Sequence, residues 1–218
     1  TLYSYQSPVS LSQQYLHLTP RSFAYQQVES SLVWIEPAAE HEEGGEDYFG
    51  NLTRHVTLTE PHKVLRVQAE SSVILSPRPG LGQIKGGPGW ESLAQMLQQL
   101  RSPATLDAAR YLYDSPHIRC SSALADYARS CFSPGRPHLQ AALALTQRIF
   151  DEFEFDDSAT DISTPLEEVL KGRRGVCQDF AQLMIGCLRS LGLAARYVSG
   201  YILTHPPAGQ PRMIGADA

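Results

Sequence analysis

Residues 172–192 read GRRGVCQDFAQLMIGCLRSLG, and this stretch carries the strongest local signals in the second half of the chain. Apolar residues recur in it at the spacing of one helix face, and they are Phe180, Leu183, Met184, Cys187, Leu188 and Leu191. Gly192 follows directly, and glycine is the residue that most often ends a helix. We therefore predict a buried helix that begins next to Cys177 and ends at Gly192.

Cys177 lies in the first turn of this predicted helix. Unpaired backbone N–H groups and the positive end of the helix dipole both favour a thiolate there, and Arg173 and Arg174 add positive charge. The alternative is that Cys177 is a small buried apolar residue, the usual place of a free cysteine. The other three cysteines, Cys120, Cys131 and Cys187, lie on or near apolar helix faces, so we predict that they belong to the core. Cys177 is therefore the candidate nucleophile.

A cysteine nucleophile needs a base, usually histidine, within hydrogen-bonding reach. The seven histidines are His17, His41, His55, His62, His117, His138 and His205. His205 follows a predicted strand, residues 195–203, but two prolines after it favour an extended loop. The chain thus offers no clear base. It has no C-x-x-C pair, metal-ligand cluster or glycine-rich phosphate loop, so we expect no metal and no cofactor.

Further helices are predicted upstream. Apolar spacing indicates helices around Leu97 and Leu124, and a third after Pro137, with a buried face that comprises Leu139, Leu143, Thr146, Phe150 and Phe153. The run Thr164-Pro165-Leu166-Glu167 has the pattern of a capping box with proline at the first helical position. It predicts a short helix that ends at Gly172.

The first part of the chain alternates apolar and polar residues between turn signals, which indicates short strands. We predict a β-sandwich domain over residues 1–75, a Gly- and Pro-rich linker over residues 76–90, and a core domain over residues 91–218. The fold class is α+β. Acidic residues crowd residues 36–47 around Gly44-Gly45, and we interpret them as a solvated loop.

Composition excludes several classes of function. Of 218 residues, 42% are hydrophobic and 19% charged, and the net charge is −5. No apolar run approaches the length of about 20 residues that spans a bilayer, so we expect no membrane segment. The acidic balance argues against nucleic acid as a partner. We find no secretory signal at the N-terminus and expect a cytoplasmic protein.

Residues 164–203 resemble the core of bacterial transglutaminase-like proteins, predicted cysteine proteases of the papain-like superfamily. The likeness joins the capping box, the Gly-Val-Cys-Gln-Asp-Phe run, the helix and the following strand in order. The N-terminal half resembles the β module that precedes this core, through Tyr3-Ser4-Tyr5, Leu18-Thr19-Pro20-Arg21 and Asp47-Tyr48-Phe49-Gly50-Asn51. Gln182 departs from the family, which commonly has His at that position.

The resemblance implies a Cys–His–Asp triad in which Cys177 attacks an amide or ester carbonyl and forms a thioacyl intermediate. Gln178 and Asp179 would support the nucleophile. Asp179 lies two residues further along the helix, so we expect a first-turn dipole partner or a loop tether and not the triad acid. The family places its catalytic His shortly after a segment like Gly215-Ala216-Asp217-Ala218. We therefore expect the core of this chain to comprise only the helical half and the first strand and to be incomplete at its C-terminus. We also expect this chain to be inactive alone.

Two functions follow from these observations. The first is a cysteine hydrolase or acyltransferase that acts on peptide or protein amides. Protease and transglutaminase share the acylation step and differ in the acceptor, and no residue here decides between them. The second is a non-catalytic interaction protein that retains the fold. The substrate and the oligomeric state cannot be predicted from the sequence.

Overall fold

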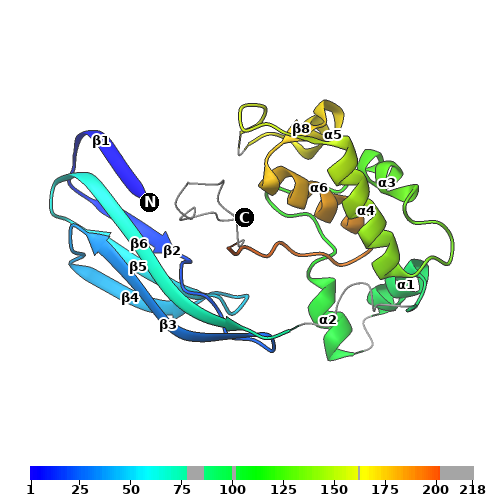
Figure 1. The fold of residues 1–218 in the computed structure, drawn as a ribbon, viewed down its shortest axis with the longest axis horizontal. Coiled ribbons are helices and arrows are strands. Elements are labelled where there is room, and N and C mark those ends of the chain that lie inside the picture. The colour runs from blue at the N-terminus through cyan, green and yellow to red at the C-terminus, as the bar shows by residue number, and fades with distance from the viewer. Residues whose placement is uncertain (78–85, 100–101, 162, 202–218) are drawn as a thin grey trace, which may run out of the picture. The chain divides into compact units, whose positions relative to one another are not determined.

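The computed structural model describes residues 1–77, 86–99, 102–161 and 163–201 (Figure 1). The chain divides into two compact units, Thr1–Gly80 and Leu81–Ala218. Strands form the described part of the first unit, and the α-helices lie in the second. Most of the linker predicted over residues 76–90 falls outside the described residues.

The first unit consists of two three-stranded antiparallel sheets. One sheet has the strand order β1-β6-β3 and the other has the order β2-β5-β4. The strands are β1 (Leu2–Val9), β2 (Ser12–Leu16), β3 (Gln26–Glu36), β4 (His41–Glu46), β5 (Leu52–Leu58) and β6 (His62–Leu75).

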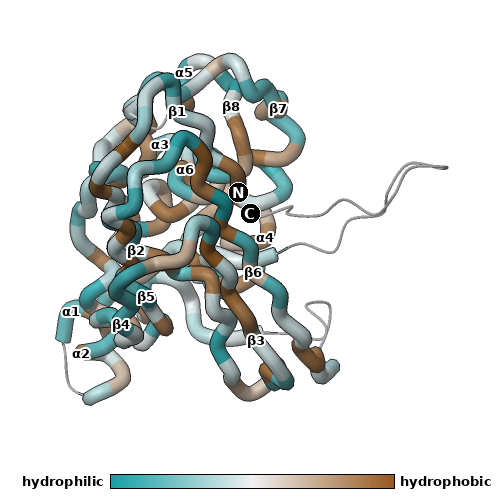
Figure 2. Tube along the Cα trace, turned by 90° about the vertical axis from the view of Figure 1, so that its left-hand side faces the viewer, coloured by the Kyte–Doolittle hydropathy of each residue, from teal (hydrophilic) through white to brown (hydrophobic). Residues whose placement is uncertain are grey.

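Side chains of both sheets meet in one small apolar core. Val56 and Leu58 of β5 and Leu65 and Val67 of β6 are buried and cluster together. Within each pair the residues are two apart, so they point to the same face of their strand. Figure 2 shows hydrophobic and hydrophilic residues following one another along β6. Two N-terminal sheets followed by helices confirm the predicted α+β class.

The acidic stretch was expected to be a loop, and this prediction is wrong. Half of it, His41–Glu46, forms β4, which includes both glycines and pairs with β5 at the edge of its sheet. Every residue of β4 is exposed, so the carboxylates remain in water as expected. Glycine and acidic residues have low strand propensity, but the hydrogen bonds of the ladder outweigh that preference here.

Residues 47–51, which carry part of the family resemblance, form the turn between β4 and β5. Asp47 Oδ1 accepts hydrogen bonds of 2.8 Å from the backbone nitrogens of Phe49 and Asn51. Arg21 Nη1 donates to the carbonyl oxygen of Phe49 at 2.9 Å. Gly50 has φ +77°, a conformation that favours glycine. These residues therefore fix the shape of the turn.

The second unit is built around α6 (Figure 1). Its elements are α1 (Trp90–Gln99), α2 (Pro103–Ala109), α3 (Ser122–Arg129), α4 (His138–Glu152), β7 (Glu154–Phe155), α5 (Leu166–Gly172), β8 (Arg174–Gly175) and α6 (Cys177–Ser190). The predicted helices around Leu97 and Leu124 are present as α1 and α3. A single apolar core joins residues of α3, α4, α5 and α6.

The helix predicted after Cys177 is confirmed as α6. Leu183 and Cys187 are fully buried in the core, and Gly186 lies between them. A Cβ atom at Gly186 would stand 3.0 Å from Leu124 Cδ1, so α6 packs closely against α3. At the other end the nitrogen of Leu193 donates to the carbonyl oxygen of Leu188 at 2.9 Å, and Gly192 has φ +78°. This is the glycine C-cap that the sequence predicts.

The buried face of α4 differs from the prediction. Ala141, Leu145 and Ile149 face the core, whereas Phe150 is 79% exposed and Leu143 is 41% exposed. Apolar residues cover more than one face of this helix, so spacing alone permits both choices. Packing against the core selects the face that includes Ala141.

The predicted capping box at Thr164 is also wrong. Pro165, not Thr164, is the N-cap of α5, and it provides no side-chain cap. The hydroxyl of Thr164 instead accepts a hydrogen bond of 2.9 Å from the backbone nitrogen of Asp161. Threonine side chains bond to nearby backbone groups in turns as readily as at helix starts. The helix does end at Gly172 as predicted.

The strand predicted over residues 195–203 is absent where the structure describes the chain. Residues 195–200 form no strand, Tyr201 makes a single bridge, and the last two predicted positions lie outside the described residues. The nitrogen of Ala195 donates to the carbonyl oxygen of Tyr111 at 3.1 Å, and its own carbonyl accepts from Arg189. A strand needs a neighbouring strand to pair with. In the described part of the chain, Ala195 instead forms these hydrogen bonds with the carbonyl of Tyr111 and the side chain of Arg189.

Candidate active site

Cys177 is the first residue of α6, and its side chain is exposed. The N-cap before it, Val176, is extended with φ −110° and ψ 174°, and its apolar side chain cannot cap the helix. Within the described residues the backbone N–H groups of Cys177 and Gln178 have no hydrogen-bond acceptor. The thiol thus lies beside open donors at the positive end of the helix dipole.

Asp179 stabilises the first turn of α6, which contains Cys177, through two hydrogen bonds. Its Oδ2 accepts a hydrogen bond of 2.8 Å from the nitrogen of Val176 and another of 2.6 Å from Thr160 Oγ1. The side chain is buried, with 7% of the residue exposed. Asp179 therefore both caps the first turn and tethers the loop around Thr160. The sequence predicted either a first-turn dipole partner or a loop tether, and the hydrogen bond to Thr160 agrees with the tether.

The chain before Cys177 is held by a short parallel ladder. Glu154 pairs with Arg174 and Phe155 pairs with Gly175. The nitrogen of Asp156 donates to the carbonyl oxygen of Gly175 at 2.9 Å. A Cβ atom on Gly175 would lie 2.6 Å from Asp179 Oδ2. Only glycine leaves room for that carboxylate.

The two arginines before Cys177 are paired with carboxylates. Arg174 Nη2 lies 3.2 Å from Glu154 Oε2, and Arg173 Nη1 lies 2.9 Å from Glu152 Oε2. Hydrogen bonds from Ser158, with the charge of Arg174, hold the pKa of Asp156 below its usual range. The positive charge that Arg173 and Arg174 were expected to add near Cys177 is therefore offset by these carboxylates.

Gln178 and Gln182 lie on α6 and are half-buried. Gln182 lines an open groove of about 710 Å³, together with Cys120 and residues at the start of α5 such as Leu166. Cys120 is thus half-buried at a surface and is not the core residue predicted, because it lies in the loop before α3. Burial, followed by the Asp114 carboxylate, raises the pKa of its thiol. Cys131 and Cys187 are buried in the core as predicted.

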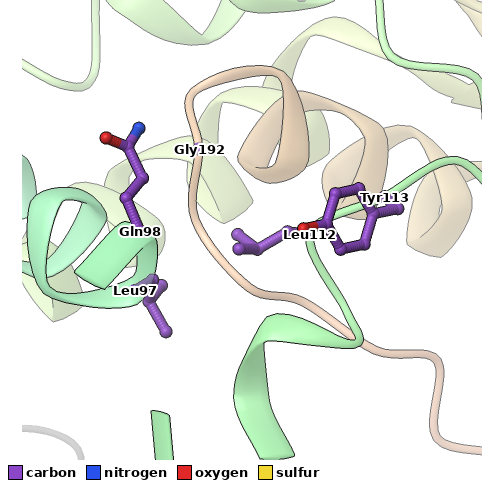
Figure 3. Close-up of a pocket in the computed structure, with 5 residues that line it drawn as sticks. All are labelled: Leu97, Gln98, Leu112, Tyr113 and Gly192. Atoms are coloured by element: carbon purple, nitrogen blue, oxygen red, sulfur yellow. The ribbon is translucent and has the colours of Figure 1, made fainter. Parts of the chain in front are cut away.

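A second cavity lies near the opposite end of α6 from the thiol (Figure 3). It has a volume of about 310 Å³ and is lined by Leu97, Gln98, Leu112, Tyr113 and Gly192. The 14 residues of α6 separate its two ends by roughly 20 Å. This cavity is therefore not part of the site around Cys177.

No described histidine forms a hydrogen bond with Cys177. In the second unit His138 Nδ1 bonds to the carbonyl oxygen of Pro88, and His117 lines the groove that contains Gln182. His205 lies outside the described residues. The structure places the predicted residues Cys177 and Asp179 in the first turn of α6. Nothing in the sequence pointed to Thr160, because no motif marks a loop threonine as the partner of a distant carboxylate.

Two protein-family models match the chain. The bacterial transglutaminase-like N-terminal region matches residues 1–74, and the transglutaminase-like superfamily matches residues 125–214. An uncharacterized protein of Mycobacterium bovis is 40% identical over 223 residues, which cover 100% of this chain and 68% of that protein. The chain belongs to the transglutaminase-like superfamily.

One more relative and one solved structure are similar to this transglutaminase-like chain. An uncharacterized protein of Mycobacterium leprae is 30% identical over 207 residues, which cover 94% of the chain and 69% of that protein. A crystal structure of a "putative cysteine protease" from Cytophaga hutchinsonii superposes with a TM-score of 0.67 at 20% identity. The match covers 92% of this chain and 64% of that one, and it shows the shared fold.

In the part of the chain that the structure describes, no helix combines the length and the apolar character that crossing a membrane requires.

Proposed function

We propose that this transglutaminase-like chain carries the nucleophile of a thiol-dependent acyl-transfer enzyme that acts on peptide or protein amides. The single observation that carries the proposal is the exposed Cys177 at the start of α6, beside first-turn N–H groups that have no acceptor among the described residues. Free cysteines that serve only packing are usually buried, whereas Cys177 is exposed.

In the proposed reaction the Cys177 thiolate attacks the carbonyl carbon of the amide. A C–S bond forms, and the carbonyl oxygen takes up negative charge as the carbon becomes tetrahedral. Unpaired backbone N–H groups are the donors that stabilise such an oxyanion, and Cys177 and Gln178 each provide one. Collapse of the intermediate breaks the C–N bond and leaves a thioester on Cys177.

The leaving nitrogen must accept a proton before it departs as an amine. Asp179 is not proposed as the donor, because its buried carboxylate already accepts two hydrogen bonds. We assign this role to none of the described histidines. The donor that we propose for the leaving nitrogen is the histidine of the family triad, which lies outside the described residues.

The thioester is then attacked by water or by a primary amine. Water gives hydrolysis, and an amine gives transfer of the acyl group to a new nitrogen. In both cases the Cys177 sulfur is released as a thiolate and the enzyme is restored. Peptide hydrolysis and transamidation are therefore two outcomes of one acyl-enzyme.

The test separates acylation from amide turnover. The chain is treated with p-nitrophenyl acetate, an activated ester whose leaving group needs no proton, and the acetyl group is mapped by mass spectrometry. We expect acetylation at Cys177 that is lost in Cys177→Ala and kept in Cys120→Ala, the matched control with a half-buried thiol. Acetylation at other thiols in preference to Cys177 would refute the nucleophile assignment.

Amide turnover is measured with the full-length gene product on casein and on a glutamine peptide with a primary amine. We expect turnover that Cys177→Ala abolishes. A Cys177 that is acetylated by the ester while neither amide is turned over would favour the non-catalytic interaction protein instead.

A further inference from the structure

Arg173 adopts a backbone conformation that is unusual for its side chain. It is the one non-glycine residue with positive φ in the described part of the chain, at φ 56° and ψ 29°. It forms the C-cap of α5, a place where glycine carries no steric penalty. Such a conformation is strained in a non-glycine residue and persists where the surrounding contacts offset that strain.

That side chain is fixed by an aromatic and acidic cluster on α3 and α4. The guanidinium carbon of Arg173 lies 4.6 Å from the ring centre of Tyr127 and 4.9 Å from that of Phe153. Its Nη1 also lies 2.9 Å from Glu152 Oε2. Tyr127 is buried, and burial, with the Glu152 charge, raises its pKa to about 12, so the ring is neutral. A planar guanidinium suits such a stacked and paired position better than an ammonium.

The backbone of the same residue is fixed on both sides. Its nitrogen donates to the carbonyl oxygen of Val169 at 3.0 Å, and its carbonyl oxygen accepts from the nitrogen of Glu154 at 2.9 Å. Four residues later the chain reaches Cys177. The segment between them contains β8 and the N-cap Val176, so its start is set by Arg173 and its end by Asp179.

We propose that Arg173 is a positioning residue for the nucleophile. Its side chain anchors the chain before Cys177 to the Tyr127–Phe153–Glu152 cluster, and this keeps Cys177 in the first turn of α6. The catalytic role of Arg173 rests on the proposed function. Its contacts with the cluster bear only on where the thiol of Cys177 lies.

The test measures the rate at which iodoacetamide alkylates Cys177 at neutral pH, which needs neither substrate nor general acid. Arg173→Gly removes the side chain and relieves the positive φ, so the backbone is not strained by the change. We expect the rate at Cys177 to fall about two- to five-fold, the size of a typical helix-terminus effect on a charge. We expect Arg173→Lys, which keeps the charge, to recover less than half of the loss.

Arg148→Lys is the matched control. Arg148 lies 4.0 Å from the ring centre of Tyr127 and pairs with the same Glu152, but it belongs to α4 and not to the segment before Cys177. We expect this variant to lower the thermal midpoint while the alkylation rate stays within a factor of about 1.5 of the parent.

Three results would overturn the proposal. An unchanged or faster rate in Arg173→Gly would show that the side chain does not place the thiol. An equal loss in Arg148→Lys would show general loosening of the core, and full recovery by lysine would show a charge effect. The ester-labelling test of Cys177 decides the proposed function separately, because it uses the parent chain and cysteine variants only.

Discussion

Asp179 Oδ2 stands 2.8 Å from the backbone nitrogen of Val176, so the third residue of α6 caps the residue before its start. The contact is one half of a capping box. The other half is missing because valine has no side-chain acceptor. In the described residues, the first turn is thereby capped by Asp179, while the N–H groups of Cys177 and Gln178 have no acceptor.

Replacement of Asp179 by alanine is expected to destabilise the second unit. The change leaves the Val176 nitrogen and the Thr160 hydroxyl without their acceptor, at a cost of about 1–3 kcal/mol. Thr160→Val removes only one of the two hydrogen bonds and should cost about half as much. Denaturation in urea measures both, and an Asp179→Ala variant no less stable than Thr160→Val would contradict the assignment.

Gly175→Ala should be harmful where Gly172→Ala is not. The new Cβ at position 175 would stand 2.6 Å from the Asp179 carboxylate, whereas nothing lies within 4 Å of a Cβ at position 172. Crowding of this kind costs about 1–3 kcal/mol. Thermal unfolding should show a lower midpoint for the first variant only. Equal midpoints would mean that the loop can shift away from the carboxylate without loss.

The four cysteines should react with limiting iodoacetamide in a defined order. Cys177 is exposed at a helix start, Cys120 is half-buried with a raised pKa, and burial raises the pKa of Cys187 to about 12. Since the thiolate is the reactive form, we expect Cys177 first, then Cys120, with Cys131 and Cys187 last. Peptide mapping after partial alkylation gives the order. Cys120 ahead of Cys177 would show that the helix terminus does not activate the thiol.

The sequence predicts α6 well because every local signal agrees. Leu183 and Cys187 of its predicted apolar face are buried, Gly192 ends it, and Cys177 begins it, although Ile185, outside that face, is buried as well. On α4 the apolar residues spread around the helix, so Leu143 and Leu145 both fit a helical period. Only contacts with other elements place Leu145 inside and Leu143 outside. Periodicity therefore locates a helix more reliably than it identifies its buried face.

The candidate site could be predicted only in part, for a related reason. Cys177 is marked by its place at the start of a predicted helix, which is local information. Thr160 contacts Asp179 across 19 residues of sequence, and Glu152 contacts Arg173 across 21. Such partners are set by the fold, and neither residue carries a recognisable motif.

Stability should depend on pH through Glu152. A hydrogen bond from Arg148, with the charges of Arg148 and Arg173, lowers the pKa of this carboxyl below its ordinary value of 4.5. A carboxyl whose pKa is lowered by folding stabilises the folded state above its unfolded pKa, and this contribution is lost as the pH falls through the lowered value. The thermal midpoint of the parent should therefore decrease from about pH 5 to about pH 3.

Glu152→Gln should start from a lower midpoint at neutral pH and lose less on acidification. Asp126→Asn is the control, because Asp126 forms an exposed pair with Arg129 at 3.6 Å, which contributes little, and its acid profile should match that of the parent. An equally steep acid profile in Glu152→Gln would show that the cluster around Tyr127 does not gain its stability from this carboxylate.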